Sequence, residues 1–167
     1  FTGIHLDAWT DVFLLGTMLY ELLTGNAPND ADTLKNALRK VKLCEPPKLP
    51  TDVLPELAAI CTKAMSKEPA QRYRDALEFQ NAIKGFLKHR ESAVIAAKAA
   101  NEALGADIPA LARAVVLYDQ ALALWPENQG FAAAVKQTRT TLAIKESRAR
   151  WTRRSLGRTA ATLAACC

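Results

Sequence analysis

Residues 11–25 read DVFLLGTMLYELLTG, and this stretch decides how the chain folds. Its apolar side chains recur too often to occupy one face, so they surround most of a helix with 3.6 residues per turn. A helix of this kind must be covered by protein on most sides. Asp11 is a suitable N-cap and Gly25 a suitable C′ glycine. The stretch predicts a buried central helix, with the Asp11 carboxylate placed to accept hydrogen bonds from a neighbouring segment.

This stretch resembles the central helix of the large lobe of eukaryotic-type (Hanks-type) serine/threonine protein kinases. Asp11 and Gly16 match the aspartate and glycine that are most diagnostic of that helix, and Pro28 matches the proline that follows it. The resemblance implies that Asp11 ties down the backbone of the catalytic loop and that Gly16 permits close packing beside it. A core helix of some other all-helical protein is the alternative.

A second block, residues 55–78, extends the resemblance. It starts with an amphipathic helix and continues with a turn reading SKEPAQRY, in which Glu68 replaces the commoner aspartate of the kinase pattern. Asp75 and Glu78 then have the spacing of a capping box. The apolar stripe of the first helix, at helical spacing, consists of Leu57, Ile60, Cys61, Ala64 and Met65.

Arg72 lies in this turn. The resemblance implies that Arg72 is the buried arginine that pairs with the glutamate of the Ala-Pro-Glu motif and so anchors the activation segment. A guanidinium suits this role because it is always charged and can bind a carboxylate through two parallel hydrogen bonds. A solvated loop arginine is the alternative.

The segments that perform phosphoryl transfer in this family are missing from the sequence. It contains no GxGxxG loop and no Val-Ala-Ile-Lys, His-Arg-Asp, Asp-Phe-Gly or Ala-Pro-Glu motif. Those segments grip the phosphates, hold the metal ions and orient the acceptor hydroxyl. The chain is therefore interpreted as the C-terminal part of a longer kinase. The parent would use ATP and Mg²⁺ to phosphorylate serine or threonine of protein substrates.

On this interpretation the chain alone binds neither ATP nor a metal ion and has no catalytic residue. Asp11, Gly16 and Arg72 would support the kinase site structurally. Between the two kinase-like blocks, a short amphipathic helix is expected over residues 32–41. In the kinase family this region helps to dock protein substrates and regulators.

The helical pattern continues past the kinase-like part. The last kinase-like helix extends from Asp75 to about Leu104, where Gly105 and Pro109 end it. Further helices are expected from about residue 110 to 124 and from about residue 129 to at least residue 148. The pair across the intervening turn resembles one tetratricopeptide repeat, through Ala114, Tyr118, Ala121, Leu122 and Pro126. One repeat cannot bury its own apolar face, and an ordinary alanine-rich bundle is the alternative.

The net charge of +5 is concentrated near the end of the chain, between Lys145 and Arg158. A basic arm can contact nucleic acid or acidic lipid, but Trp151 alone does not make a stacking platform. We therefore expect a solvated helix end and no nucleic-acid partner. No apolar stretch is long enough for a membrane span, and a cytoplasmic location is expected. Metal-ligand spacing is absent from Cys44, Cys61, Cys166, Cys167, His5 and His89.

The sequence thus predicts an all-α chain in three parts. Residues 1–88 would be the lower part of a kinase large lobe, 89–150 a tetratricopeptide-like extension that offers a surface for a protein partner, and 151–167 an irregular basic tail. Part of a serine/threonine kinase is the favoured function. A non-catalytic helical-repeat adaptor that binds a protein partner is the alternative, and the sequence upstream of Phe1 would distinguish the two.

Overall fold

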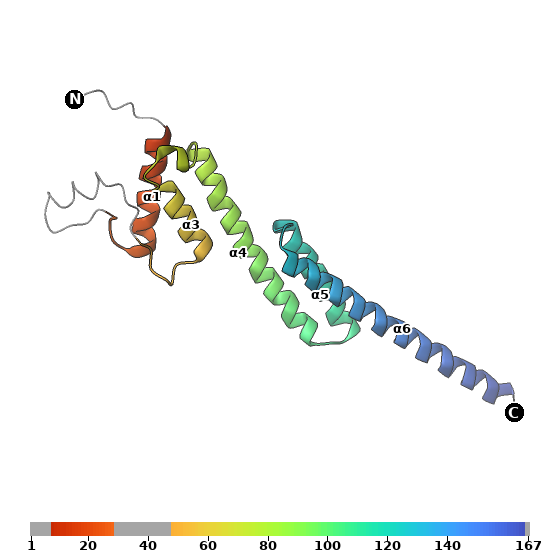
Figure 1. The fold of residues 1–167 in the computed structure, drawn as a ribbon. Helices are drawn as coiled ribbons and strands as arrows, with labels where there is room; N and C mark the ends of the chain where they lie inside the picture. Colours follow the sequence, from red (N-terminus) through yellow and green to blue (C-terminus); the bar gives the residue numbers. More distant parts are fainter. Residues whose placement is uncertain (1–7, 29–47, 166–167) are drawn as a thin grey trace, which may run out of the picture. The chain divides into compact units, whose positions relative to one another are not determined.

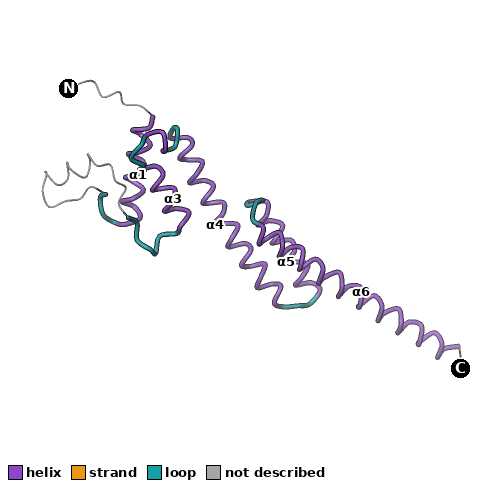
Figure 2. The backbone as a smooth tube through the Cα atoms, viewed as in Figure 1, coloured by secondary structure: helices purple, strands orange, loops and turns teal. Residues whose placement is uncertain are grey.

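The computed structural model describes residues 8–28 and 48–165 (Figure 1). These residues form helices joined by turns, without a strand (Figure 2), so the described part of the chain is all-α as predicted. The expected helix over residues 32–41 lies outside the described residues, as do His5, Cys44 and the Cys166–Cys167 ending. The elements are α1 (Ala8–Thr24), α3 (Pro55–Ala64), the 3₁₀ helix η1 (Pro69–Gln71), α4 (Ala76–Leu104), α5 (Ile108–Leu124) and α6 (Gln129–Ala165).

The chain divides into two compact units, residues 1–87 and 88–167, and the division falls within α4. The first unit packs α1 against α3 and η1. Its core contains one apolar stripe from each helix together with the aromatic side chains that follow the turn. The buried members are Val12, Ile60, Ala64, Tyr73, Phe79 and Phe86. The predicted stripe of α3 is confirmed, because four of its five side chains are buried and Leu57 packs against this core.

The two ends of α1 differ in how well the sequence predicted them. Gly25 follows the helix with a φ of +72°, and its N–H donates to the Glu21 carbonyl at 2.7 Å. The predicted glycine C-cap is therefore confirmed. The predicted N-cap is wrong, because α1 begins at Ala8 and Asp11 lies within the first turn.

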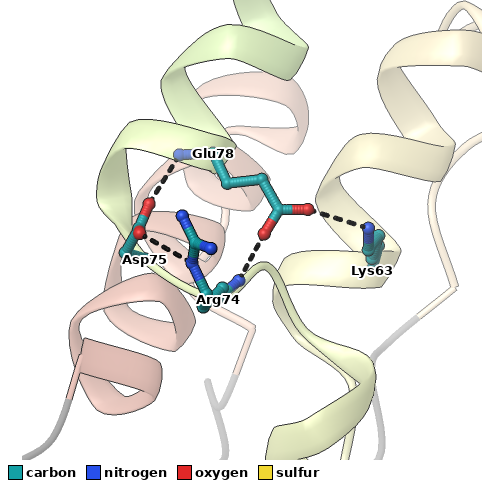
Figure 3. Close-up of polar contacts among 4 residues, drawn as sticks. All are labelled: Lys63, Arg74, Asp75 and Glu78. Atoms are coloured by element: carbon teal, nitrogen blue, oxygen red, sulfur yellow. Dashed lines mark hydrogen bonds and ion pairs between the residues drawn. The ribbon is translucent and has the colours of Figure 1, made fainter.

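The start of α4 is held by a capping arrangement (Figure 3). The Glu78 N–H donates to Asp75 Oδ1 at 2.8 Å, as a capping box requires. The returning bond differs from the prediction, since Glu78 Oε2 accepts from the N–H of Arg74 at 2.7 Å instead of from that of Asp75. The other oxygen, Oε1, is 3.7 Å from Lys63 Nζ. Glu78 therefore links the start of α4 to α3.

The second unit contains the later part of α4 together with α5 and α6. Its core is built largely from small side chains, which allow helices to approach closely, and consists of Ala96, Ala99, Tyr118, Ala121 and Val135. Within this unit, the buried hydroxyl of Ser92 donates to the Ala121 carbonyl at 2.7 Å. The N-terminus of α6 is capped by Asn128, whose Oδ1 accepts from the Phe131 N–H at 3.0 Å.

Two expectations about the second unit need correction. Pro109 lies in the first turn of α5 instead of ending the previous helix, and the cap is Asp107, whose Oδ1 accepts from the Ala110 N–H at 2.7 Å. Proline suits this position because an N–H in the first helical turn has no intrahelical acceptor. Residues 151–165 were expected to be irregular but continue α6. Arginine and alanine are strong helix formers, which explains why a helix persists where apolar spacing fades.

Candidate functional site

Gly16 lies where α1 comes closest to α3. A Cβ atom added to Gly16 would stand 2.8 Å from the Ala64 Cβ and 2.8 Å from the Met65 Cγ, closer than such atoms can approach. Only glycine therefore fits this position without a shift of α3. Among the described residues, α3 is the helix that packs closely against Gly16. The sequence alone did not identify this neighbour.

The thiol of Cys61 belongs to the same contact. Its Sγ lies 3.6 Å from the Gly16 carbonyl oxygen, and the side chain is almost completely buried. Burial raises the pKa of the Cys61 thiol to about 11. Because the thiolate is the nucleophilic form, Cys61 is a neutral packing group at neutral pH and not a reactive residue.

Arg72 connects the turn before α4 to the start of α1. Its Nε donates to the Ser66 carbonyl at 2.7 Å, Nη1 to the Trp9 carbonyl at 3.1 Å and Nη2 to the Lys67 carbonyl at 3.3 Å. The guanidinium carbon also lies 4.7 Å from the centre of the Phe13 ring, a cation–π distance. Arg72 is thus a half-buried residue that fixes backbone in both segments, and not a solvated loop arginine.

These partners of Arg72 carried no recognisable signal in the sequence. Backbone carbonyls exist at every position, so only the fold selects Trp9, Ser66 and Lys67 as acceptors. Trp9 also lay before the expected start of the helix. The resemblance pointed to Arg72 but suggested a carboxylate partner, whereas the acceptors within residues 8–28 and 48–165 are carbonyl oxygens.

Asp11 lies on a different face of α1 from Gly16. It is exposed, and it shares its face with three large apolar side chains at the spacing i+3, i+7 and i+11. Leu14 is 53% exposed, Met18 61% and Leu22 83%. We call this surface the Asp11 face. One acidic group followed by a row of apolar side chains is typical of a surface that another protein segment covers.

A nucleotide and its metal ions need clustered carboxylates and groups that hold phosphates. Within residues 8–28 and 48–155, no group of three or more His, Cys, Asp or Glu side chains is arranged to hold a metal ion. The three predicted support residues comprise one carboxylate, one glycine and one arginine that already binds carbonyls. This set does not fit ATP–Mg²⁺. No helix of the described part is long and apolar enough to span a bilayer.

Comparison with known proteins gives a consistent group of relatives. The chain is 40% identical over 94 residues to the tyrosine-protein kinase MasK of Myxococcus xanthus, covering 54% of this chain and 14% of the relative. It is 41% identical over 83 residues to the serine/threonine-protein kinase PknB of Mycolicibacterium smegmatis, covering 47% and 13%. About half of the chain is thus similar in sequence to bacterial protein kinases, one named a tyrosine-protein kinase and the other a serine/threonine-protein kinase.

A longer match shows the same kind of relative. The probable serine/threonine-protein kinase SCO3848 of Streptomyces coelicolor is 34% identical over 108 residues, covering 62% of this chain and 16% of the relative. The chain thus spans 13–16% of the length of these three relatives. No family model matches the chain, and no solved structure matches it. The similarity to kinases and the all-α fold of the described residues are both consistent with a chain that contains part of a kinase large lobe.

Proposed function

We propose that this chain is the C-terminal part of a serine/threonine kinase domain, followed by a helical extension. The parent protein would transfer the γ-phosphoryl group of ATP, with Mg²⁺, to serine or threonine of protein substrates. The observation that carries this proposal is the identity of 40–41% with two bacterial kinases over about half the chain. Because the reaction consumes ATP, the cytoplasm is the proposed location of the kinase part.

The Asp11 face supports the proposal through its composition. In a kinase large lobe, this face would be covered by the segment that carries the catalytic loop, and the Asp11 carboxylate would accept hydrogen bonds from its backbone. Asp11 would then be a positioning residue. Covering Leu14, Met18 and Leu22 would remove apolar area from water, which stabilises the lobe by about 25 cal/mol per Å².

Arg72 supports the proposal through its unused donors. A guanidinium has five N–H groups, of which three bind the carbonyls of Ser66, Trp9 and Lys67. Among the described residues, no acceptor binds the remaining N–H on each Nη, and a carboxylate could accept from both through two parallel hydrogen bonds. We propose that a glutamate of the activation segment takes this position, so that Arg72 anchors that segment while holding α1.

The test uses the full-length gene product and the matched variants Asp11→Ala and Glu21→Ala, two exposed acids of α1. Wild-type protein should transfer phosphate from γ-labelled ATP to serine or threonine, identified by phosphoamino-acid analysis. Asp11→Ala should lower kcat at least tenfold with little change in KM for ATP, whereas Glu21→Ala should not. If phosphotyrosine were the main product, the proposed acceptor would be tyrosine instead of serine or threonine. This outcome is included because one relative is named a tyrosine kinase.

A second outcome separates this proposal from the adaptor. The second unit has its own core and a buried hydrogen bond, and its tetratricopeptide-like positions Ala114, Tyr118 and Ala121 are buried. A helical-repeat adaptor for a protein partner is therefore the alternative. Absence of a Gly-rich loop, His-Arg-Asp and Asp-Phe-Gly from the coding sequence upstream of Phe1 would favour the adaptor. Residues 1–167 alone should bind no ATP–Mg²⁺ in calorimetry, and micromolar binding would contradict the proposal that the nucleotide site lies upstream.

A further inference from the structure

The later part of α6 carries a concentrated positive charge, with Glu146 as the one acid in residues 144–155. Four arginines lie within seven residues, and no acidic residue occurs between Ser147 and Ser155. All four side chains are exposed to solvent. They are Arg148, Arg150, Arg153 and Arg154.

Three other basic side chains of the same unit have partners. Arg139 binds both carboxylate oxygens of Asp119 at 2.7 and 2.8 Å, and Arg113 lies 3.0 Å from Glu102 Oε2. Lys145 donates to the Ala106 carbonyl. Among the residues that the structure describes, no ion pair involves the four arginines after Lys145. Arg139 in the first half of α6 is thus paired with an acid, whereas the four later arginines have no acidic partner among the described residues.

An aromatic side chain lies among these arginines. Trp151 is 70% exposed and Ile144 49% exposed. Ile144, Arg148 and Trp151 follow the i, i+4, i+7 spacing of one helix face. Tryptophan and arginine with an aliphatic neighbour are typical of a helix that lies at a lipid headgroup layer, because the indole is amphipathic and the guanidinium forms two bonds with phosphate.

We propose that residues 144–155 of α6 bind the surface of a membrane that contains anionic phospholipids. Trp151 lies at headgroup level, and Arg148 and Arg154, about 60° to either side of Trp151 around the helix, contact lipid phosphates from a helix parallel to the surface. A nucleic acid is the less suitable partner, since sequence-independent binding of single strands uses several stacking aromatics and this surface has one. The proposal does not depend on the kinase function.

The test is co-sedimentation of the whole 167-residue chain with vesicles of phosphatidylcholine, with and without about one third phosphatidylserine. Binding should require phosphatidylserine and weaken as salt is raised. Arg148→Gln/Arg154→Gln should weaken it about 30-fold, because each basic residue near an anionic surface contributes about fivefold. The control Lys98→Gln/Lys136→Gln removes the same charge from exposed sites on α4 and on the first half of α6 and should leave binding within about twofold.

Three results would overturn the proposal. Equal binding to both vesicle types at any salt would indicate adhesion through apolar surface such as the Asp11 face. Equal losses in the two double variants would indicate an effect of net charge without a site. Tighter binding to a short DNA duplex than to the anionic vesicles, at equal phosphate concentration, would assign the arginines to nucleic acid.

Discussion

The two units are built from helices of similar kinds but bury them differently. In the first unit, α1 packs one face on α3 through Gly16 and leaves Leu14, Met18 and Leu22 exposed on another. In the second unit, α5 buries Ala114, Tyr118 and Ala121, and on its outer surface Arg113 and Asp119 pair with acids and bases of the neighbouring helices. The first unit therefore leaves a row of apolar side chains on one helix uncovered. The large exposed apolar side chains of the second unit are instead spread over α4, α5 and α6, and they are Val94, Leu104, Val116, Ile144 and Trp151.

This difference has a thermodynamic consequence. Exposed Leu and Met side chains contribute nothing to folding until something covers them, and a domain is stable by only about 5–15 kcal/mol. The first unit should therefore be the weaker one in the isolated chain. Hydrogen exchange, read peptide by peptide, measures the two units separately, and the variants below are placed so that each reports on one of them.

The largest effect is expected at Arg72. Arg72→Ala removes three charged hydrogen bonds and the contact with Phe13, and it should destabilise the first unit by about 2–3 kcal/mol. Arg72→Lys should restore little of this, because an ammonium cannot form the planar set of bonds. The measurement is denaturant unfolding with hydrogen exchange of peptides from α1 and α3.

A neighbouring arginine supplies the control for this variant. The Arg74 side chain is 80% exposed and pairs only with the adjacent Asp75 among the described residues. Arg74→Ala should stay within about 0.5 kcal/mol of wild type. Equal stabilities of the Arg72 and Arg74 alanine variants would show that the turn before α4 does not depend on its carbonyl-binding arginine.

The next largest effect is expected at Gly16. Alanine would usually stabilise a helix interior by about 1 kcal/mol relative to glycine, but here its Cβ would meet Ala64 and Met65 at 2.8 Å. Overpacking of this kind costs about 1–3 kcal/mol, so Gly16→Ala should lower the stability of the first unit overall.

Gly85 provides a matched control in α4, because a Cβ added there would meet nothing within 4 Å. Gly85→Ala should raise stability by about 0.5–1 kcal/mol. Opposite signs for the two substitutions, read as shifts of the denaturant midpoint, are the expected result. A gain at both positions would mean that α1 and α3 are not in close contact.

The sequence predicted best those features that depend on neighbours along the chain. The Gly25 C-cap, the Asp75–Glu78 box and the apolar stripe of α3 are local patterns, and all three are present. Asp11 was placed at the N-cap because it is a good capping residue. The residues before Asp11, starting at Ala8, are helical as well. The Trp9 carbonyl in this turn accepts a hydrogen bond from Arg72, which lies far away in the sequence.

The position of Pro109 and the length of α6 could not be predicted from the local sequence, each for its own physical reason. Proline both ends and begins helices, so the sequence alone does not show to which helix Pro109 belongs, whereas the Asp107 cap places it in α5. The later part of α6 buries little, so apolar spacing is weak there even though the segment is helical. The proposed roles of Asp11, Gly16 and Arg72 in a kinase site remain predictions.

A smaller effect, confined to the second unit, is expected at Ser92. Its buried hydroxyl donates to the Ala121 carbonyl at 2.7 Å, and that carbonyl also accepts from the Trp125 N–H at 3.0 Å. Because the carbonyl keeps one partner, Ser92→Ala should cost only about 1 kcal/mol. Hydrogen exchange should accelerate in α5 and not in α3. The exposed Ser147→Ala on α6 is the control, and acceleration in both units would mean that they unfold together.

The smallest effect is a pH dependence at the start of α4. The N–H of Glu78, and then the side chain of Arg74, hold the pKa of the Asp75 carboxyl below its ordinary value near 3.8. Because the pKa is lower in the folded state, Asp75 contributes stability above pH 4, and this contribution is lost as the pH falls through the ordinary value toward the folded one. Asp75→Asn keeps an oxygen that can cap the helix but does not titrate in this range. The wild type should therefore lose slightly more thermal stability than Asp75→Asn between pH 5 and pH 3, in melts monitored at α1 and α3. Glu127→Gln, in the turn before α6, is the control, and an acid response of Asp75→Asn equal to that of the wild type would mean that the Asp75 carboxylate does not stabilise the first unit.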